Sequence, residues 1–143
     1  MNELVEKVSN TSWYGLALQA LIILATHEGI CPSSVMAKKL GFQSTFLRKV
    51  LTHLVKADII QAKEGRDGGY SLNKSPEEIT LAGVYHALTA ELFPKGFLNV
   101  QSKECFAPPT QDALCDLRDE MEGWIIEGLE KKTLADLLNK RLS

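Results

Sequence analysis

The sequence is poor in cysteine and contains no long apolar run. Its three cysteines, an odd number at wide spacing, exclude the disulfide framework of a small secreted domain and fit a reducing compartment. The longest apolar stretch, residues 13–26, is interrupted by Gln19 and is too short to span a bilayer. It also lacks the flanks of a signal peptide, so we expect a cytoplasmic protein with no membrane partner.

Catalytic and metal-binding signatures are missing as well. The three histidines, His27, His53 and His86, lie too far apart for a two-histidine metal motif on one helix. The sequence contains no nucleophile-elbow serine, no phosphate-binding glycine loop and no carboxylate pair with a catalytic partner. We therefore expect neither an enzyme nor a bound metal ion.

Charge is unevenly distributed along the 143 residues, although the net charge is only −2. Residues 1–37 carry a net charge of −2, and residues 75–143 carry −5. Residues 38–74 carry eight basic against three acidic side chains, a net charge of +5. A basic middle between acidic ends is typical of a DNA-binding protein, and a chance cluster on a solvated face is the alternative.

The hydrophobic pattern predicts three helices followed by a β-hairpin. The first helix covers residues 12–28 and ends at Gly29; the second covers 35–40, capped by Ser33 or Ser34. The third covers residues 44–58, capped by Ser44, and three- and four-residue spacing gives it an inner face of Leu47, Val50, Leu51 and Leu54. The two short helices form a helix-turn-helix. Residues 59–63 and 69–72 are expected to be strands around a glycine-rich turn. The predicted fold class is mainly α with a small β-hairpin, a winged helix-turn-helix.

The rest of the chain predicts a dimerisation segment. We divide the sequence into a DNA-binding domain (1–92), a loop without periodicity (93–110) and a C-terminal part (111–143), which contains a long helix and a short one capped by Thr133 and Asp136. Thr80 is expected to cap a helix over 81–89. The long helix carries an apolar stripe that suits a second copy of the chain, or alternatively the chain's own domain. The stripe consists of Leu114, Leu117, Met121, Trp124, Ile125 and Gly128.

The third helix has a polar and basic outer face that suits the major groove of DNA. This face consists of Thr45, Arg48, Lys49, Thr52, His53 and Lys56. A bidentate contact of Arg48 with guanine would provide roughly 1–3 kcal/mol of discrimination. At the hairpin tip, the positive charges of Lys63 and Arg66 are opposed by Glu64 and Asp67. The alternative is that these are solvated residues around two core helices. The predicted DNA-binding residues are Ser33, Ser34, Gln43, Ser44, Thr45, Arg48, Lys49, Thr52, Lys63 and Arg66.

Three motifs carry a family resemblance: FLRKVLTHLVKADII at residues 46–60, GRDGGYSL at 65–72, and ITL at 79–81. With residues 14–25, Trp124 and Thr133-Leu134, they make most of the chain similar to the Rrf2 family of bacterial winged helix-turn-helix regulators. This family includes the iron–sulfur-cluster, nitric-oxide and cysteine-metabolism repressors. The resemblance implies a homodimer whose long C-terminal helix crosses its partner, binding to an imperfect palindrome, and repression.

The chain departs from the family pattern at two places. Glu64 stands where many members carry an arginine before the first wing glycine. Cluster-binding members place three cysteines at short regular spacing before the long helix, whereas here Cys105 and Cys115 are ten positions apart and Cys31 is distant. Three interpretations stay open: an iron–sulfur cluster, which the spacing disfavours because about four ligands are needed; a thiol sensor formed by Cys105 and Cys115; or thiols without a sensing role.

The sequence therefore predicts a sequence-specific DNA-binding transcription regulator, a repressor that binds a palindromic operator as a homodimer and needs no cofactor. The alternative is a winged-helix interaction or ligand-binding module that no longer binds DNA, which the acidic C-terminal half and Glu64 favour.

Overall fold

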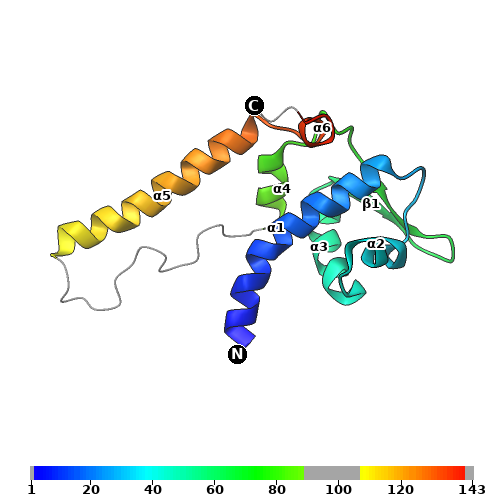
Figure 1. Ribbon diagram of the computed structural model, residues 1–143, viewed down its shortest axis with the longest axis horizontal. Helices are drawn as coiled ribbons and strands as arrows, with labels where there is room; N and C mark the ends of the chain where they lie inside the picture. The colour runs from blue at the N-terminus through cyan, green and yellow to red at the C-terminus, as the bar shows by residue number, and fades with distance from the viewer. Residues whose placement is uncertain (1, 89–106, 141–143) are drawn as a thin grey trace.

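The computed structural model describes the backbone of residues 2–88 and 107–140, and the side chains of residues 13–88 and 107–140. Its elements are α1 (Asn2–Thr26), α2 (Ser33–Leu40), α3 (Ser44–Lys56), β1 (Ile60–Lys63), β2 (Gly69–Leu72), α4 (Leu81–Ala87), α5 (Pro108–Glu130) and α6 (Leu134–Leu138). Mostly helical with one hairpin, this is the predicted fold class. Figure 1 shows α1 to α4 gathered on one side, with α5 leading away from them. Among the described residues, none of the helices combines the length and the apolar character that a membrane-spanning segment requires.

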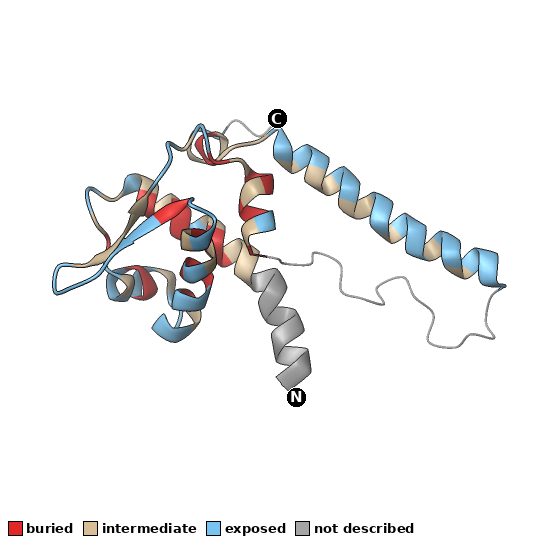
Figure 2. Ribbon diagram, turned by 180° about the vertical axis from the view of Figure 1, so that it is seen from behind, coloured by how far each residue is buried: buried red, intermediate tan, exposed pale blue. Residues whose placement is uncertain are grey.

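The hydrophobic core lies between α1, α3 and α4, and Figure 2 shows the buried residues concentrated there. The predicted inner face of α3 is confirmed. Burial of each large apolar side chain on this face contributes about 1.5–3 kcal/mol to the stability of the fold. Packing against the core therefore determines which side of α3 remains in solvent. The fully buried residues of α3 are Leu47, Val50, Leu51 and Leu54.

The wing is a hairpin attached to the chain that leads into α2. β1 and β2 pair antiparallel, with Ile60 opposite Leu72 and Lys63 opposite Gly69. Cys31 adds an isolated bridge: its N–H donates to the Tyr70 carbonyl at 2.8 Å, and the Tyr70 N–H donates to the Cys31 carbonyl at 2.9 Å. This close approach requires glycine at position 69, where a Cβ would lie 2.5 Å from the Cys31 carbonyl oxygen.

The segment after α5 is attached to the segment before α4. The Leu81 N–H donates to the Lys132 carbonyl at 2.9 Å, and the Leu134 N–H donates to the Ile79 carbonyl at 2.8 Å. Thr80 caps α4 as predicted, accepting from the Gly83 N–H at 3.0 Å. The predicted capping box at the start of α6 is also present. The C-terminal end of α5 is therefore anchored to the winged helix.

Several predicted boundaries differ from the structure. α1 begins at Asn2 rather than near Ser12, and residues 2–11 contain neither the glycine nor the proline that would break a helix there. Ser33, Ser34 and Ser44 do not cap their helices: the capping positions are Pro32 and Gln43, and neither helix has a side-chain cap. α3 ends at residue 56 rather than 58. α5 begins at Pro108, so the last three residues of the predicted loop 93–110 are helical, while 93–106 lie outside the described residues.

Candidate nucleic-acid interface

The outer face of α3 is exposed, opposite the buried leucines and valine. Thr45, Arg48, Lys49 and Thr52 all lie in solvent. The Thr52 hydroxyl donates to the Arg48 carbonyl at 2.8 Å, so its oxygen and methyl group remain for an outside contact. The two ion pairs found among the described residues both involve Arg118 on α5, so the cations of α3 are not neutralised by a described carboxylate.

His53 is the exception on this predicted outer face. Its ring is half-buried and lies 5.6 Å from that of Trp13 on α1, between centroids. Trp13 also meets Phe46 edge-on at 5.8 Å, and Phe46 stacks with Phe42 at 5.9 Å. Such aromatic contacts contribute about 0.5–1.5 kcal/mol each beyond their burial. They fix α3 against α1, so His53 belongs to the support of the helix.

The N-termini of α2 and α3 offer backbone N–H groups to an anion. The first amides of a helix have no partner within it, and no side chain caps either of these two ends. The Ser33, Ser34 and Ser44 hydroxyls, which the sequence predicts as caps, are therefore left for outside partners. Gln43, Ser44 and Thr45 are all exposed. Such helix ends are favourable positions for phosphate groups.

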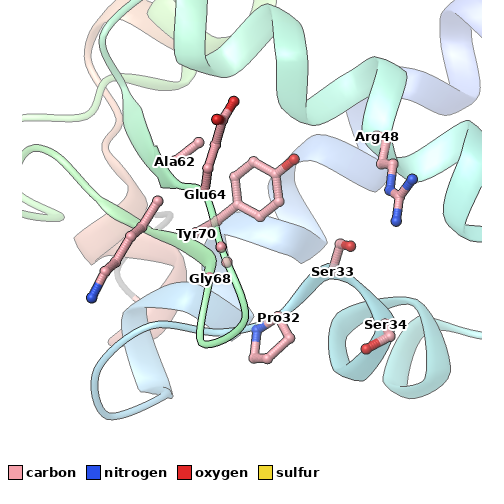
Figure 3. Close-up of a pocket in the computed structure, with 11 residues that line it drawn as sticks. Pro32, Ser33, Ser34, Arg48, Ala62, Glu64, Gly68 and Tyr70 are labelled. Carbon is pink, nitrogen blue, oxygen red and sulfur yellow. The ribbon is translucent and has the colours of Figure 1, made fainter.

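An open cleft of about 540 Å³ lies between the wing, the start of α2 and the outer face of α3. It brings together four of the predicted DNA-binding residues, which come from three separate elements. Figure 3 shows Ser33 and Tyr70 between the wing on one side and Arg48 on the other. The predicted residues that line the cleft are Ser33, Ser34, Arg48 and Lys63.

Tyr70 and Glu64 also line the cleft, and neither is among the predicted DNA-binding residues. Tyr70 is half-buried on β2 and places a hydroxyl group among the serines and Arg48. Glu64 contributes the opposite charge to Arg48 and Lys63, so the cleft is mixed rather than uniformly cationic. The bridge between Cys31 and Tyr70 positions this tyrosine, and no sequence pattern signals a pairing between residues so far apart.

The predicted dimerisation stripe is only partly covered by the described residues. Leu117 is 39% exposed and Trp124 59% exposed, while Leu114, Met121 and Ile125 are half-covered and Gly128 is exposed. Residues of a different face, Ile126 and Leu129, pack against the core. The chain's own winged helix therefore does not cover the stripe.

The described cysteines lie in different parts of the molecule. Cys31 is fully buried at the base of the wing, and this burial raises the pKa of its thiol. Cys115 is exposed on α5, and Cys105 lies outside the described residues. Within residues 13–88 and 107–140, no three His, Cys, Asp or Glu side chains gather as a metal site would require. An iron–sulfur cluster needs about four ligands, so the described residues do not fit one.

Comparison with known families gives one match across most of the chain. Residues 11–140 match the model of the Rrf2 family, described as an iron-dependent transcriptional regulator. A candidate HTH-type transcriptional regulator from Synechocystis is 33% identical over 90 residues, which are 62% of this chain and 60% of that protein. A second candidate HTH-type regulator, from Mycobacterium tuberculosis, is 28% identical over 123 residues, 85% of this chain and 75% of the relative.

Two solved structures share the fold. IscR from T. potens has a TM-score of 0.66 and 24% identity, covering 90% of this chain and 85% of its own. CymR, the global cysteine regulator of B. subtilis, has a TM-score of 0.62 and 24% identity, and the match covers 90% of this chain and 94% of CymR. At these identities the likeness concerns the arrangement of helices and wing.

Proposed function

This chain belongs to the Rrf2 family of transcription regulators, which are not enzymes, and from that premise we propose that it binds a palindromic DNA operator as a homodimer and represses transcription. The observation that carries the proposal is the exposed outer face of α3, where neither Arg48 nor Lys49 forms an ion pair with a described carboxylate. A recognition helix must offer such a face to enter the major groove. Repression is supported by the resemblance to the family's repressors.

The three parts of the proposed interface have different roles in DNA binding. Arg48 and the exposed threonines of α3 read base edges, with Arg48 suited to a bidentate contact with guanine. The uncapped starts of α2 and α3 hold phosphate groups through their N–H groups. Lys63 and Arg66 on the wing approach the neighbouring backbone or minor groove.

The homodimer is supported by the uncovered stripe of α5. A two-fold partner presents the same stripe in return, so each copy would cover the exposed Trp124 and Leu117 of the other. Dimerisation also repeats the small interface of one winged helix on a second half-site, about 34 Å away along the duplex. The palindrome then follows from the symmetry of the protein.

Selection of bound fragments from genomic DNA tests the proposal. Wild-type protein should enrich fragments that contain an inverted repeat. Arg48→Ala should weaken binding to the selected site by about 1–3 kcal/mol, which is roughly fivefold to over a hundredfold. Lys131→Ala, which removes an exposed cation at the end of α5, is the matched control and should leave the affinity unchanged.

A second outcome would favour the alternative function. If no fragment is enriched, and if Arg48→Ala and Lys49→Ala bind random DNA as the wild type does, the fold would serve as an interaction or ligand-binding module.

A reporter gene under a selected operator distinguishes repression from activation. Deletion of the regulator should raise expression of the reporter. Lower expression after deletion would replace repression by activation.

We also propose that DNA binding requires no iron–sulfur cluster. This is supported by the separation of Cys31 from Cys115 and by the wide spacing of Cys105 and Cys115 in the sequence. Protein purified without oxygen should be colourless and should bind its operator. Visible absorbance from a cluster, lost together with DNA affinity, would contradict this. Operator affinity that changes on peroxide treatment, and not in Cys105→Ser/Cys115→Ser protein, would assign a thiol-sensing role.

A further inference from the structure

We propose that Tyr85 and Glu122 are positioning residues that fix the angle of α5 against the winged helix and thereby set the half-site spacing the dimer accepts. The Tyr85 hydroxyl on α4 donates to Oε1 of Glu122 on α5, at 3.0 Å. This inference rests on the proposed homodimer and operator, because spacing has meaning only for two recognition helices on one duplex.

Tyr85 is held rigidly on the side of the winged helix. Its side chain is 3% exposed, and the ring of Tyr14 meets it edge-on at 5.7 Å with an interplanar angle of 86°. The Tyr14 hydroxyl in turn donates to the Leu81 carbonyl at 2.9 Å, at the start of α4. Burial, followed by the neighbouring Tyr85, raises the pKa of Tyr14 to about 12, so this donor keeps its proton at neutral pH. The tyrosine that contacts α5 thus belongs to a fixed assembly of α1 and α4.

Among the described residues, α5 is attached to the winged helix through its C-terminal end, so a small change of angle there moves its other end over a large distance. Backbone hydrogen bonds attach the residues just after it, Lys132 and Leu134, to the segment before α4. No residue of α5 is fully buried, and Figures 1 and 2 show its N-terminal end far from the winged helix. From Glu130 to Pro108 the helix rises by about 33 Å. A rotation of about 6° at the anchor would move the far end by about 3.4 Å, the rise of one base pair.

The hydrogen bond supplies a directional restraint that the apolar contacts of α5 lack. Ile126 and Leu129 pack against the core near the anchor, where contacts between aliphatic side chains change little under small rotations. Glu122 lies one to two helical turns farther from the anchored end of α5 than Ile126 and Leu129. Its hydrogen bond to Tyr85 therefore restrains both the rotation of α5 about its own axis and its tilt relative to the winged helix. Arg118 bonds the other carboxylate oxygen of Glu122 at 3.4 Å, which holds that side chain in place.

The first test measures spacing preference directly. Selected operators are altered by one or two base pairs between the half-sites, and their affinities are compared for wild type, Tyr85→Phe, Glu122→Gln and Glu127→Ala. Tyr85→Phe should reduce the discrimination between correct and altered spacing by about tenfold, because it removes a hydrogen bond to a charged group. Glu122→Gln, whose amide oxygen still accepts, should retain most of the preference. Glu127→Ala, an exposed carboxylate on the same helix, should retain all of it.

A merely structural role gives a different result. In that case Tyr85→Phe would lower affinity equally at every spacing, or lower only thermal stability, and the proposal would be overturned. Binding to a single half-site and the dimer dissociation constant should stay unchanged in Tyr85→Phe. A wild-type protein that binds DNA without any spacing preference would contradict the palindrome and, with it, the assigned role in specificity.

A second measurement judges the restraint without DNA. Spin labels at Lys56→Cys on α3 and Asp112→Cys on α5, in Cys105→Ser/Cys115→Ser protein diluted with unlabelled chain, report the distance within one protomer. The wild-type distribution should be narrow, and Tyr85→Phe should broaden or shift it by a few ångströms. Identical distributions would overturn the restraint whatever the DNA experiments show. If no DNA is bound but the distributions differ, the proposed function fails and the restraint stands.

Discussion

The segment from α1 to α4 and the helix α5 bury their apolar residues in different ways. The first surrounds a core of fully buried side chains, including Leu51 and Leu54, to which α6 adds Leu134. The second has no fully buried residue and leaves Trp124 and Leu117 in solvent. An apolar stripe of this kind marks an interaction surface. The difference indicates that the apolar residues of α1 to α4 are covered within the described chain, whereas the stripe on α5 stays open to the partner copy that we propose.

Charge divides the same two regions. The helix-turn-helix and wing lie in the basic middle of the sequence, while α5 carries most of the acidic residues of the C-terminal half. DNA attracts the first region and repels the second. The proposed DNA-binding face and the proposed dimer face therefore lie in regions of opposite charge, and matched substitutions in the two regions should have different effects.

The largest contrast is expected in thiol reactivity. Cys31 is fully buried and the pKa of its thiol is raised, so alkylation needs both an opening of the wing base and deprotonation of the thiol to a thiolate that burial disfavours. Cys115 is exposed on α5. In native protein, Cys31 should react at least about a thousandfold more slowly than Cys115, as measured by peptide mass spectrometry over time. Comparable rates would mean that the wing base is not closed.

The same leucine-to-alanine change should have different consequences in the two regions. Leu51→Ala removes a fully buried side chain of α3 and should lower the free energy of unfolding by about 3 kcal/mol, at every protein concentration. Leu117→Ala should instead weaken the dimer by about 1–2 kcal/mol, since its side chain is 39% exposed in one chain. Denaturant titration and sedimentation measure the two effects. A large stability loss in monomeric Leu117→Ala would contradict the contrast.

Glycine-to-alanine changes should differ in sign. Gly69→Ala brings a Cβ to 2.5 Å from the Cys31 carbonyl oxygen, so the backbone must shift, at a cost of about 1–3 kcal/mol. Gly123→Ala on α5 meets nothing within 4 Å and should stabilise the helix by up to about 1 kcal/mol. Thermal unfolding of both variants checks the prediction. A neutral Gly69→Ala would show that the wing is not held against Cys31.

The smallest contrast concerns helix capping. Thr133→Ala removes the capping box of α6 and should cost about 1 kcal/mol of stability. Ser44→Ala should cost less than about 0.5 kcal/mol, because Ser44 is exposed and caps nothing. Its effect should fall on DNA affinity instead. Equal stability losses in the two variants would return Ser44 to the capping role that its sequence context suggests.

Features encoded by local pattern were predictable from the sequence. The three- and four-residue spacing of α3 identified its buried face, and the glycine-rich turn identified the wing. Thr80 and Thr133 were recognised as caps because their helices begin immediately after them. The same rule failed for Ser33 and Ser44, since the residues before them, Pro32 and Gln43, have extended backbone angles and take the capping positions.

Features that depend on distant pairs could not be predicted. Tyr70 enters the cleft because Cys31, 39 positions earlier, pairs with its backbone. Tyr85 and Glu122 are 37 positions apart and meet only once α5 is anchored. His53 is polar like its neighbours on the outer face of α3, and only its contact with the ring of Trp13 on α1 leaves it half-buried. Neither residue propensity nor periodicity carries such information.

The salt dependence of operator binding tests the central claim, that the exposed cationic face of α3 meets a DNA duplex. The dissociation constant for a selected palindrome should rise between about 50 and 200 mM salt along a straight line in logarithmic coordinates, because bound phosphates release counterions. Lys49→Ala should lower the slope by about one unit for each phosphate that the lysine no longer neutralises. A dissociation constant that ignores salt, or a slope that Lys49→Ala leaves unchanged while Arg48→Ala binds normally, would contradict the account.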